Sequence, residues 1–291
     1  CEQDIQNKWA QYIKPYAHCI KTDHAGNVIG ILNPDAPFKV LIAAHCDEIG
    51  FMVRRIDEKG FVYLSKVGGV DPKLAPGMKI ELRGYQGNIT GIIGASPAHF
   101  SEDKDKIEFE DLYVDCGAET KEEMEQYLRP GDLGVYKREP ELLLHDKISG
   151  RGLDNRTGIF IMAETLKKLA QSNPQVGLYF ASTSSEEIGA YGAYNAGAGI
   201  APDMTIICDV TFSTDHPGVD SNKYDPIELG KGPALGIGPA VNRKINDLIK
   251  ETAKEHNIPL QFELYASSTG TDGDIIRFTG KGVPIALISL P

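Results

Sequence analysis

Cysteine, tryptophan and long apolar runs are all scarce in this sequence. The cysteines are odd in number, widely scattered and form no Cys-x-x-Cys pair, which argues against a structural zinc knuckle and fits a reducing compartment. Apolar runs such as residues 40–44 are far too short to span a bilayer, so we expect no membrane partner. The five cysteines are Cys1, Cys19, Cys46, Cys116 and Cys208.

Positive charge is also in short supply. The chain has 30 lysines and arginines against 41 acidic residues, a formal net charge of −11. An acidic protein does not attract phosphate backbones, so nucleic acid is not expected as a partner. Residues 1–14 are polar with a helical pattern and do not resemble a signal peptide, which makes the cytoplasm the expected location.

The 291 residues fall into two textures. Residues 49–140 alternate short β-type runs with glycine, proline and aspartate turns, which is typical of a small all-β domain of barrel-like form. The flanking residues, 1–48 and 141–291, alternate strands with helices. We therefore predict an α/β fold, in which a discontinuous domain forms a mixed sheet sandwiched between helices and carries the all-β domain as an insertion.

Apolar residues at helical spacing predict the helices, and short apolar runs between turn residues predict the strands. The predicted helices are residues 2–14, 155–170, 190–198, 243–256 and 272–278. The predicted strands of the α/β part are residues 28–32, 38–44, 176–181, 204–210, 260–265 and 284–289. Those of the insertion are residues 60–64, 79–82, 89–93 and 112–114.

The first candidate site residues are His45 and Asp47. His45 ends an apolar strand, at the edge where open α/β sheets place their ligands. Two residues further on, Asp47 points the same way and can accept the second ring N–H of His45, as in carboxylate–histidine–metal arrangements. Taken alone, the pair also fits a satisfied, partly buried histidine beside a solvated turn.

Four further acids occupy comparable positions. Asp154 lies where a loop becomes a helix, where it could also be a helix cap. Glu186 and Glu187 directly follow a predicted strand, and their adjacent charges repel unless a cation or proton relieves them; the alternative is a solvated acidic loop. Asp209 ends an apolar strand, where it needs a partner, whether a metal, a helix end or a salt bridge.

Together these residues place histidine and carboxylates at successive strand ends of one sheet, which is where a site is expected. Oxygen and imidazole ligands without thiolate suit zinc, cobalt or manganese in a catalytic site. A pair of metals would need a bridging carboxylate and about two further protein ligands each, which leaves one glutamate free as a general base.

With these motifs in order, the sequence resembles the tetrahedral (TET-type) glutamyl and deblocking aminopeptidases, some of which carry the name endoglucanase. The resemblance runs from about Glu2 to Pro291. Its motifs are Ala44-His45-Cys46-Asp47-Glu48-Ile49-Gly50, Leu153-Asp154-Asn155-Arg156-Thr157-Gly158, Glu186-Glu187-Ile188-Gly189 with Gly192-Ala193, Asp209-Val210-Thr211, Gly230-Lys231-Gly232-Pro233, Gly270-Thr271-Asp272, Val67-Gly68-Gly69-Val70 and Pro97-Ala98-His99.

The resemblance implies a zinc-aminopeptidase-like fold, a substrate class of short peptides and two divalent metal ions per subunit, zinc or cobalt. It implies that the insertion pairs subunits into a homo-oligomer, a dodecamer built from dimers. The implied roles are as follows: His45 and Asp209 bind one metal, Glu187 binds the other, Asp154 bridges both, Asp47 orients His45, and Glu186 is the general base.

The sequence departs from the family pattern at three places. Asn155 replaces a second aspartate; because the first acid is the bridging one, we expect the metals to survive. Ser184 and Ser185 precede the paired acids. The family continues beyond the position of Pro291 with a metal-binding histidine, so we expect the sequence to be a fragment whose second metal is weakly held and whose activity is low.

Other functions remain open at this point. An endoglucanase-type glycoside hydrolase would use two carboxylates without a metal, but Trp9 is the single tryptophan and no aromatic platform for sugars is evident. A catalytically impaired metal-binding homologue and a related carboxypeptidase or deacetylase are the remaining alternatives. Sensitivity to a chelator would separate the glycoside hydrolase from an aminopeptidase, and metal content per chain would separate the impaired homologue. A carboxypeptidase or deacetylase would instead prefer a free C-terminus or an N-acyl group.

Overall fold

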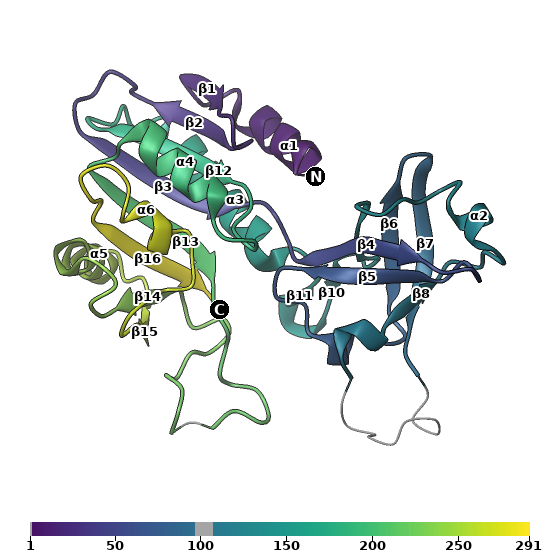
Figure 1. The fold of residues 1–291 in the computed structure, drawn as a ribbon. Helices are drawn as coiled ribbons and strands as arrows, with labels where there is room; N and C mark the ends of the chain where they lie inside the picture. Colours follow the sequence, from purple (N-terminus) through teal and green to yellow (C-terminus); the bar gives the residue numbers. More distant parts are fainter. Residues whose placement is uncertain (1, 97–106, 221) are drawn as a thin grey trace. The chain divides into compact units, whose positions relative to one another are not determined.

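The computed structural model describes residues 2–96, 107–220 and 222–291. It divides into two compact units, one formed by Cys1–Asp47 with Asp154–Pro291 and the other by Glu48–Leu153 (Figure 1). Within these described ranges, every helix is too short or too polar to span a bilayer. The motif Pro97-Ala98-His99 lies outside the described residues.

The first unit is built on one eight-stranded mixed sheet with the order β1-β2-β12-β3-β13-β16-β14-β15. Its central strands β12, β3, β13 and β16 run parallel, whereas β2 and β14 run antiparallel to their inner neighbours. The strands are β1 (Cys19–Thr22), β2 (Val28–Leu32), β3 (Lys39–His45), β12 (Gly177–Thr183), β13 (Met204–Val210), β14 (Ala234–Ile237), β15 (Gln261–Leu264) and β16 (Ile285–Leu290).

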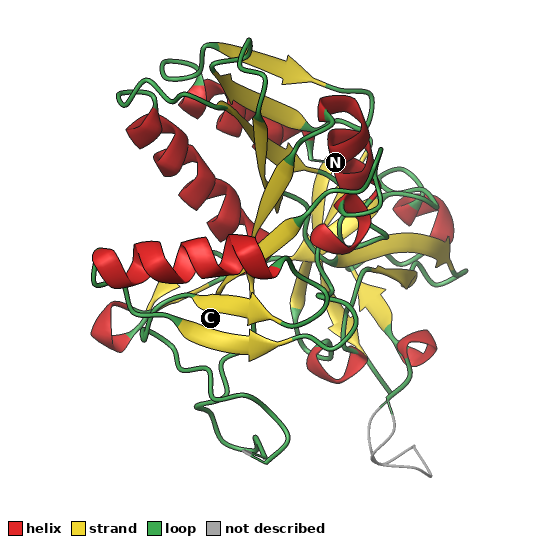
Figure 2. Cartoon of the chain, turned by 90° about the vertical axis from the view of Figure 1, so that its left-hand side faces the viewer, coloured by secondary structure: helices red, strands yellow, loops and turns green. Residues whose placement is uncertain are grey.

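Helices cover both faces of this sheet. Alternate residues of the central strands point to opposite faces, as in Phe180 and Tyr179 of β12, and enter two separate apolar clusters. One cluster includes residues of α1 (Gln3–Ile13) and α3 (Leu153–Leu169), and the other includes residues of α4 (Tyr191–Ile200) and α6 (Gly273–Ile276). Helix α5 (Arg243–Glu255) packs on β14 and β16. Figure 2 shows these helices in red beside the yellow strands.

The second unit is a closed barrel with the strand order β4-β5-β8-β7-β6-β9. Its strands are β4 (Gly50–Ile56), β5 (Val62–Val67), β6 (Lys79–Gly84), β7 (Gly87–Gly94), β8 (Tyr113–Asp115) and β9 (Leu133–Tyr136). Short helical segments η1 (Pro72–Leu74), η2 (Phe109–Asp111) and α2 (Lys121–Met124) lie between them, and a hairpin of β10 (Glu141–Leu142) and β11 (Ile148–Ser149) follows, with η3 (Leu144–Asp146) in its turn.

Near the two ends of this unit, Arg151 donates a hydrogen bond to Glu48 at 2.5 Å, which joins them as an ion pair. The first and last residues of the inserted unit therefore lie close together. It has its own apolar core, which includes Phe51, Ile80 and Leu82, each at most 1 % exposed. The barrel is thus an inserted unit with a separate core.

The predicted α/β fold with an inserted barrel is confirmed. Every predicted helix and strand is present, with ends shifted by a few residues at most. Strands β1, β4, β9, β10, β11 and β14 were not predicted; in β4, for example, Arg54 and Arg55 are both exposed and interrupt the apolar alternation. The finer likeness to zinc aminopeptidases and the insertion's role in pairing subunits stay predictions.

We predict a large loss of stability when Phe180 at the centre of β12 is replaced by alanine. The ring is fully buried, so Phe180→Ala should lower the free energy of unfolding by about 3–5 kcal/mol. Phe212 is 90 % exposed, so the matched variant Phe212→Ala should change it by less than about 0.5 kcal/mol. Chemical denaturation measures both, and equal losses would contradict this placement of the core.

Candidate metal centre and active site

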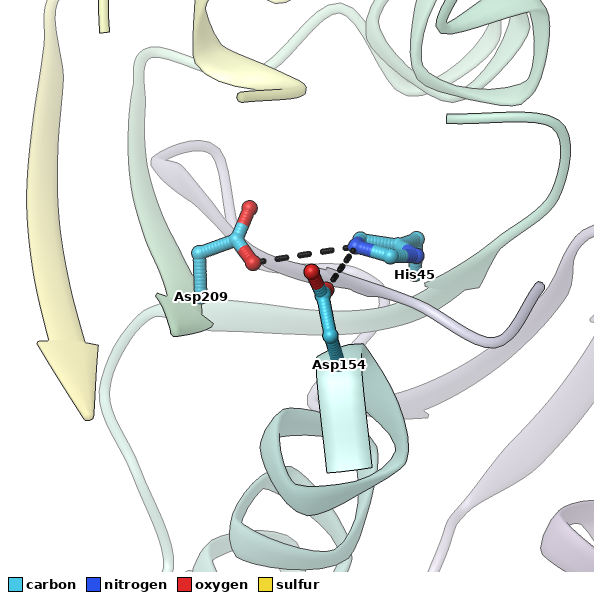
Figure 3. Close-up of side chains that lie close together, drawn as sticks. All are labelled: His45, Asp154 and Asp209. Atoms are coloured by element: carbon cyan, nitrogen blue, oxygen red, sulfur yellow. Dashed lines mark ion pairs between the residues drawn. The ribbon is translucent and has the colours of Figure 1, made fainter. Parts of the chain in front are cut away.

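Three side chains converge at the carboxyl ends of the central parallel strands. His45 is the last residue of β3 and pairs in register with Thr183, the last residue of β12; Asp209 lies near the end of β13. The His45 Nε2 atom lies 3.0 Å from Asp154 Oδ1 and 3.7 Å from Asp209 Oδ1 (Figure 3). One ligand atom from each residue lies within 4.8 Å of the others, a spacing that can hold a metal ion.

Asp154 enters this group from the start of helix α3. Its backbone is not helical (φ −82°, ψ 109°), so its side chain projects from the helix end, where 57 % of it is exposed. The next residue, Asn155, caps the helix: its Oδ1 accepts from the N–H of Gly158 at 3.0 Å. Its Nδ2 donates to the carbonyl of Cys208 at 2.9 Å, beside Asp209, so this amide ties the helix start to β13.

The Asp47 carboxylate joins the histidine to the turn that follows β12. Its Oδ1 lies 3.5 Å from His45 Nδ1, as expected for a residue that orients the ring. The two oxygens also accept hydrogen bonds from the backbone N–H groups of Glu186 and Glu187, each at 3.1 Å. Asp47 is 6 % exposed. The Asp47 carboxylate therefore contacts both the His45 ring and the turn that carries Glu186 and Glu187. The sequence had predicted only the contact with the ring.

Glu186 and Glu187 lie half-buried on that turn. They are not part of the group formed by His45, Asp154 and Asp209, but their charges act on it: Asp154 is the carboxylate that most affects Glu187, and Asp272 and Asp209 affect Glu186. The structure thus gathers all six predicted residues at one strand edge, with three side chains in direct convergence.

The electrostatics of the edge reflect an excess of negative charge. Burial, followed by the neighbouring carboxylates, raises the pKa of Glu186 to about 8 and that of Glu187 to about 7. Burial alone would lower the pKa of His45, but its contacts with three carboxylates raise it instead. Burial opposes the shift at Asp47 as well, where the hydrogen bonds from His45 and the turn lower the pKa.

Asp272 is a residue of this edge for which sequence reasoning gave no role, although the Gly270-Thr271-Asp272 motif had been noted. Its carboxylate is 1 % exposed and accepts a hydrogen bond from the Thr183 hydroxyl at 2.5 Å. Its other oxygen, Oδ1, is buried with no hydrogen-bond partner among the described residues. Burial raises the pKa of Asp272 to about 7.

The donor set fits a divalent cation. An imidazole nitrogen and carboxylate oxygens, with no thiolate among them, are the ligands of catalytic zinc and of related metals. The three carboxylates that raise the pKa of His45 would equally favour a cation among these side chains, because metals displace protons from such ligands. The nearby thiol of Cys46 is buried, and burial raises its pKa to about 12, so it is a poor ligand.

Comparison with known proteins decides the family. Residues 26–291 match the family model of the M42 glutamyl aminopeptidases. The chain belongs to this family. Lysyl aminopeptidase of Pyrococcus furiosus is 36 % identical over 292 residues, covering 99 % of this chain and 83 % of that protein.

Solved structures agree. The TET aminopeptidase of the marine sediment archaeon Thaumarchaeota archaeon SCGC AB-539-E09 superposes with a TM-score of 0.93 at 27 % identity, covering 99 % of this chain and 83 % of its own. The TET1 peptidase of Pyrococcus horikoshii, which can assemble into a tetrahedron or a large octahedral shell, has a TM-score of 0.86 at 29 % identity over 100 % of this chain and 86 % of its own.

This M42 peptidase is therefore a metal-dependent aminopeptidase, and the prediction of that activity is confirmed. Of the alternatives, the glycoside hydrolase is disfavoured, because family and site both belong to peptidases. The assignment of individual ligands and of the number of metals stays a prediction, as does the expected effect of the sequence ending at Pro291.

We predict that Asp47→Ala weakens metal binding. Residues that orient a metal-binding histidine typically contribute about 10- to 100-fold to affinity, and Asp47 also holds the turn with Glu187. Calorimetric titration of metal-free protein with zinc measures the effect.

The matched control for this experiment is Asp57→Ala in the barrel. Asp57 Oδ1 accepts from the backbone N–H groups of Lys59 and Phe61, each at 3.0 Å, so the control removes the same kind of hydrogen bonds in the other unit. Zinc affinity should be unchanged in this control. Equal affinities in wild type and Asp47→Ala would show that Asp47 has no part in the metal centre.

Proposed function

We propose that the edge of the sheet binds two divalent metals and removes N-terminal residues from short peptides. His45 and Asp209 would hold one metal, Glu187 the other, and Asp154 would bridge both. The observation that carries the proposal is the convergence of His45 Nε2 with carboxylate oxygens of Asp154 and Asp209 inside 4.8 Å. Asp154 is the proposed bridge: its side chain is 57 % exposed, whereas those of His45 and Asp209 are 3 % and 7 % exposed.

Zinc and cobalt are the proposed metals, since the ligands are imidazole and carboxylate. When bound, such ions supply Lewis-acid polarisation of a peptide carbonyl and lower the pKa of water, the chemistry that peptide hydrolysis needs near neutral pH. The residues of the chain supply position and proton transfer.

Glu186 is the proposed general base. Its carboxylate lies half-buried on the turn beside the three converging side chains, and a glutamate held there can both take and return a proton. Its carboxylate would take a proton from the attacking water and pass it to the leaving amine. Asp47 contributes by fixing the backbone of Glu186, with the N–H to Oδ1 distance at 3.1 Å.

We predict that a strong chelator abolishes activity, that zinc or cobalt restores it, and that Glu186→Gln remains inactive after metal is added back. The amide keeps the shape of the side chain but cannot accept the proton, so kcat should fall by about 10²–10⁴-fold while metal content is unchanged. Release of a chromogenic amine from aminoacyl substrates, with metal analysis of each protein, measures both.

Asp154→Ala serves as the contrasting variant, because it should lose metal and activity together. Full activity in metal-free protein would refute a metal mechanism. Retained activity in Glu186→Gln would refute the assigned base. Retained metal in Asp154→Ala would refute the bridge.

The inserted barrel carries none of the proposed catalytic residues, and we propose that it pairs subunits. Its exposed apolar side chains include Leu74, at 72 % exposure, and Ile92, at 42 %, which such pairing would cover. The related TET1 peptidase can form closed shells. A tetrahedral dodecamer with inward-facing sites would admit only short or unfolded peptides, and the acidic composition fits a cytoplasmic enzyme of this kind.

We predict that the protein is a dodecamer in solution. Light scattering after size exclusion should give a mass twelve times the 31.7 kDa of one chain. Polar replacement of Ile92 in the barrel should shift the mass downward if its exposed face is an interface, while replacement of the exposed Phe212 in the other unit serves as a control. A stable monomer would refute the cage and the size selection that it implies.

A further inference from the structure

The turn between β12 and α4, which presents Glu186 and Glu187, has four backbone hydrogen bonds of its own, including one from the N–H of Gly192 to the carbonyl of Ser184 at 3.0 Å, but the N–H groups of the two acids take part in none of them. Its residues Ser185, Gly189 and Ala190 have positive φ values of 62°, 117° and 56°. The N–H groups of Glu186 and Glu187 donate to the Asp47 side chain. The geometry of the paired acids therefore depends on side chains that come from other parts of the chain.

A second such side chain is Asn27, which lies just before β2. Its Oδ1 accepts from the backbone N–H of Ser184 at 3.0 Å, at the start of the turn. Its Nδ2 donates to the carbonyl of Gly192 at 2.8 Å, at the start of α4. One amide thus spans both ends of the segment that carries Glu186 and Glu187.

Only an amide side chain can both accept and donate these hydrogen bonds. Asn27 is 0 % exposed, so each of its polar atoms needs a partner, and both have one. Its Nδ2 also donates to Asp23 Oδ2 at 2.7 Å. An aspartate at this position would lose both donors and place a second negative charge beside Asp23, while an alanine would leave the buried N–H of Ser184 without its acceptor.

The residues next to Asn27 are themselves held in place by hydrogen bonds. Asp23 Oδ1 accepts from the backbone N–H groups of Ala25 and Asn27, each at 3.0 Å. Gln6 of α1 donates to the carbonyls of Gly26 and Ser182, at 3.1 and 2.8 Å. Asn27 therefore presents a rigid surface to the turn.

The contact between Asn27 and the turn is also closely packed on the side of α4. A Cβ atom added to Gly192 would lie 2.3 Å from the Ser184 carbonyl oxygen and 2.4 Å from Asn27 Oδ1. Such distances are not tolerated without movement of the turn or of Asn27. The glycine is thus required for α4 to approach the amide.

From this arrangement we propose that Asn27 is a positioning residue for the reaction. Acting through Ser184 and Gly192, it holds the turn at the setting from which Glu186 reaches its proton and Glu187 its ligand position. The inference rests on the proposed roles of those two acids. Because misplacement of a reacting group by about 1 Å can cost about 100-fold in rate, loss of Asn27 should lower kcat far more than loss of an ordinary buried asparagine.

Asn246 is that ordinary buried asparagine. It is 3 % exposed, its Nδ2 donates to the carbonyl of Gly236 at 2.7 Å, and it lies on α5 beside β14. Asn27→Ala and Asn246→Ala therefore remove the same group from positions that are 0 % and 3 % exposed, but the Oδ1 of Asn246 has no hydrogen-bond partner among the described residues, so the Asn246 variant loses fewer hydrogen bonds. Both should lower the midpoint of unfolding, which sets the structural baseline for the comparison.

The experiment compares kcat, KM and hydrogen exchange of the full chain. Asn27→Ala should lower kcat about 10- to 100-fold with little change in KM, and peptides covering residues 184–192 should exchange faster even in metal-free protein. Asn246→Ala should retain kcat and leave exchange in those peptides unchanged. If Asn27→Ala does not fold, Gly192→Ala disturbs the same contact from the other side and should give the same pattern.

Equal kcat values in the Asn27 and Asn246 variants, or unchanged exchange of residues 184–192, would overturn the inference. Failure of the proposed function has a different signature. An active Glu186→Gln would remove the assigned role of the turn whatever Asn27→Ala does, whereas an inactive Glu186→Gln with a fully active Asn27→Ala refutes the positioning role alone.

Discussion

The central constraint on this protein is the crowding of carboxylates around one buried imidazole. His45 lies among Asp47, Asp154 and Asp209, and the strand order leaves no freedom in this, because β3 and β13 are adjacent and parallel and so end at the same edge. Like charges this close are costly without a cation. A metal ion at this edge of the sheet would offset the repulsion between the carboxylates, and the fold holds their side chains in place.

A second constraint is the shape of the turn that carries Glu186 and Glu187. The turn with Glu186 and Glu187 includes residues with positive φ and is held by the side chains of Asp47 and Asn27 as well as by its own backbone hydrogen bonds. Asp47 therefore couples the ring of His45 to the paired acids, so a change at any of these positions is felt at the others. The site is better described as one network of hydrogen bonds than as a set of independent ligands.

Much of the fold and the site residues at the strand ends could be predicted from sequence, because strand ends, charge and motif spacing are local features. His45 and Asp209 follow apolar runs that mark β3 and β13. Asn27 and Asp272 could not be given roles in this way, since their meaning lies in contacts with Ser184 and Thr183, far along the chain. Strand β4 also escaped, because two consecutive exposed residues, Arg54 and Arg55, at a shift in register with β5 break the alternation.

The ion pair between Glu48 and Arg151 has a consequence for how the site assembles during folding. His45 and Asp154 are separated by about a hundred residues, and closing so long a flexible loop carries an entropic cost that slows the formation of distant contacts. A barrel that folds on its own core and brings its ends together reduces that loop to a short one. A barrel that formed first would therefore shorten the loop between His45 and Asp154, so that these two side chains could meet early in folding.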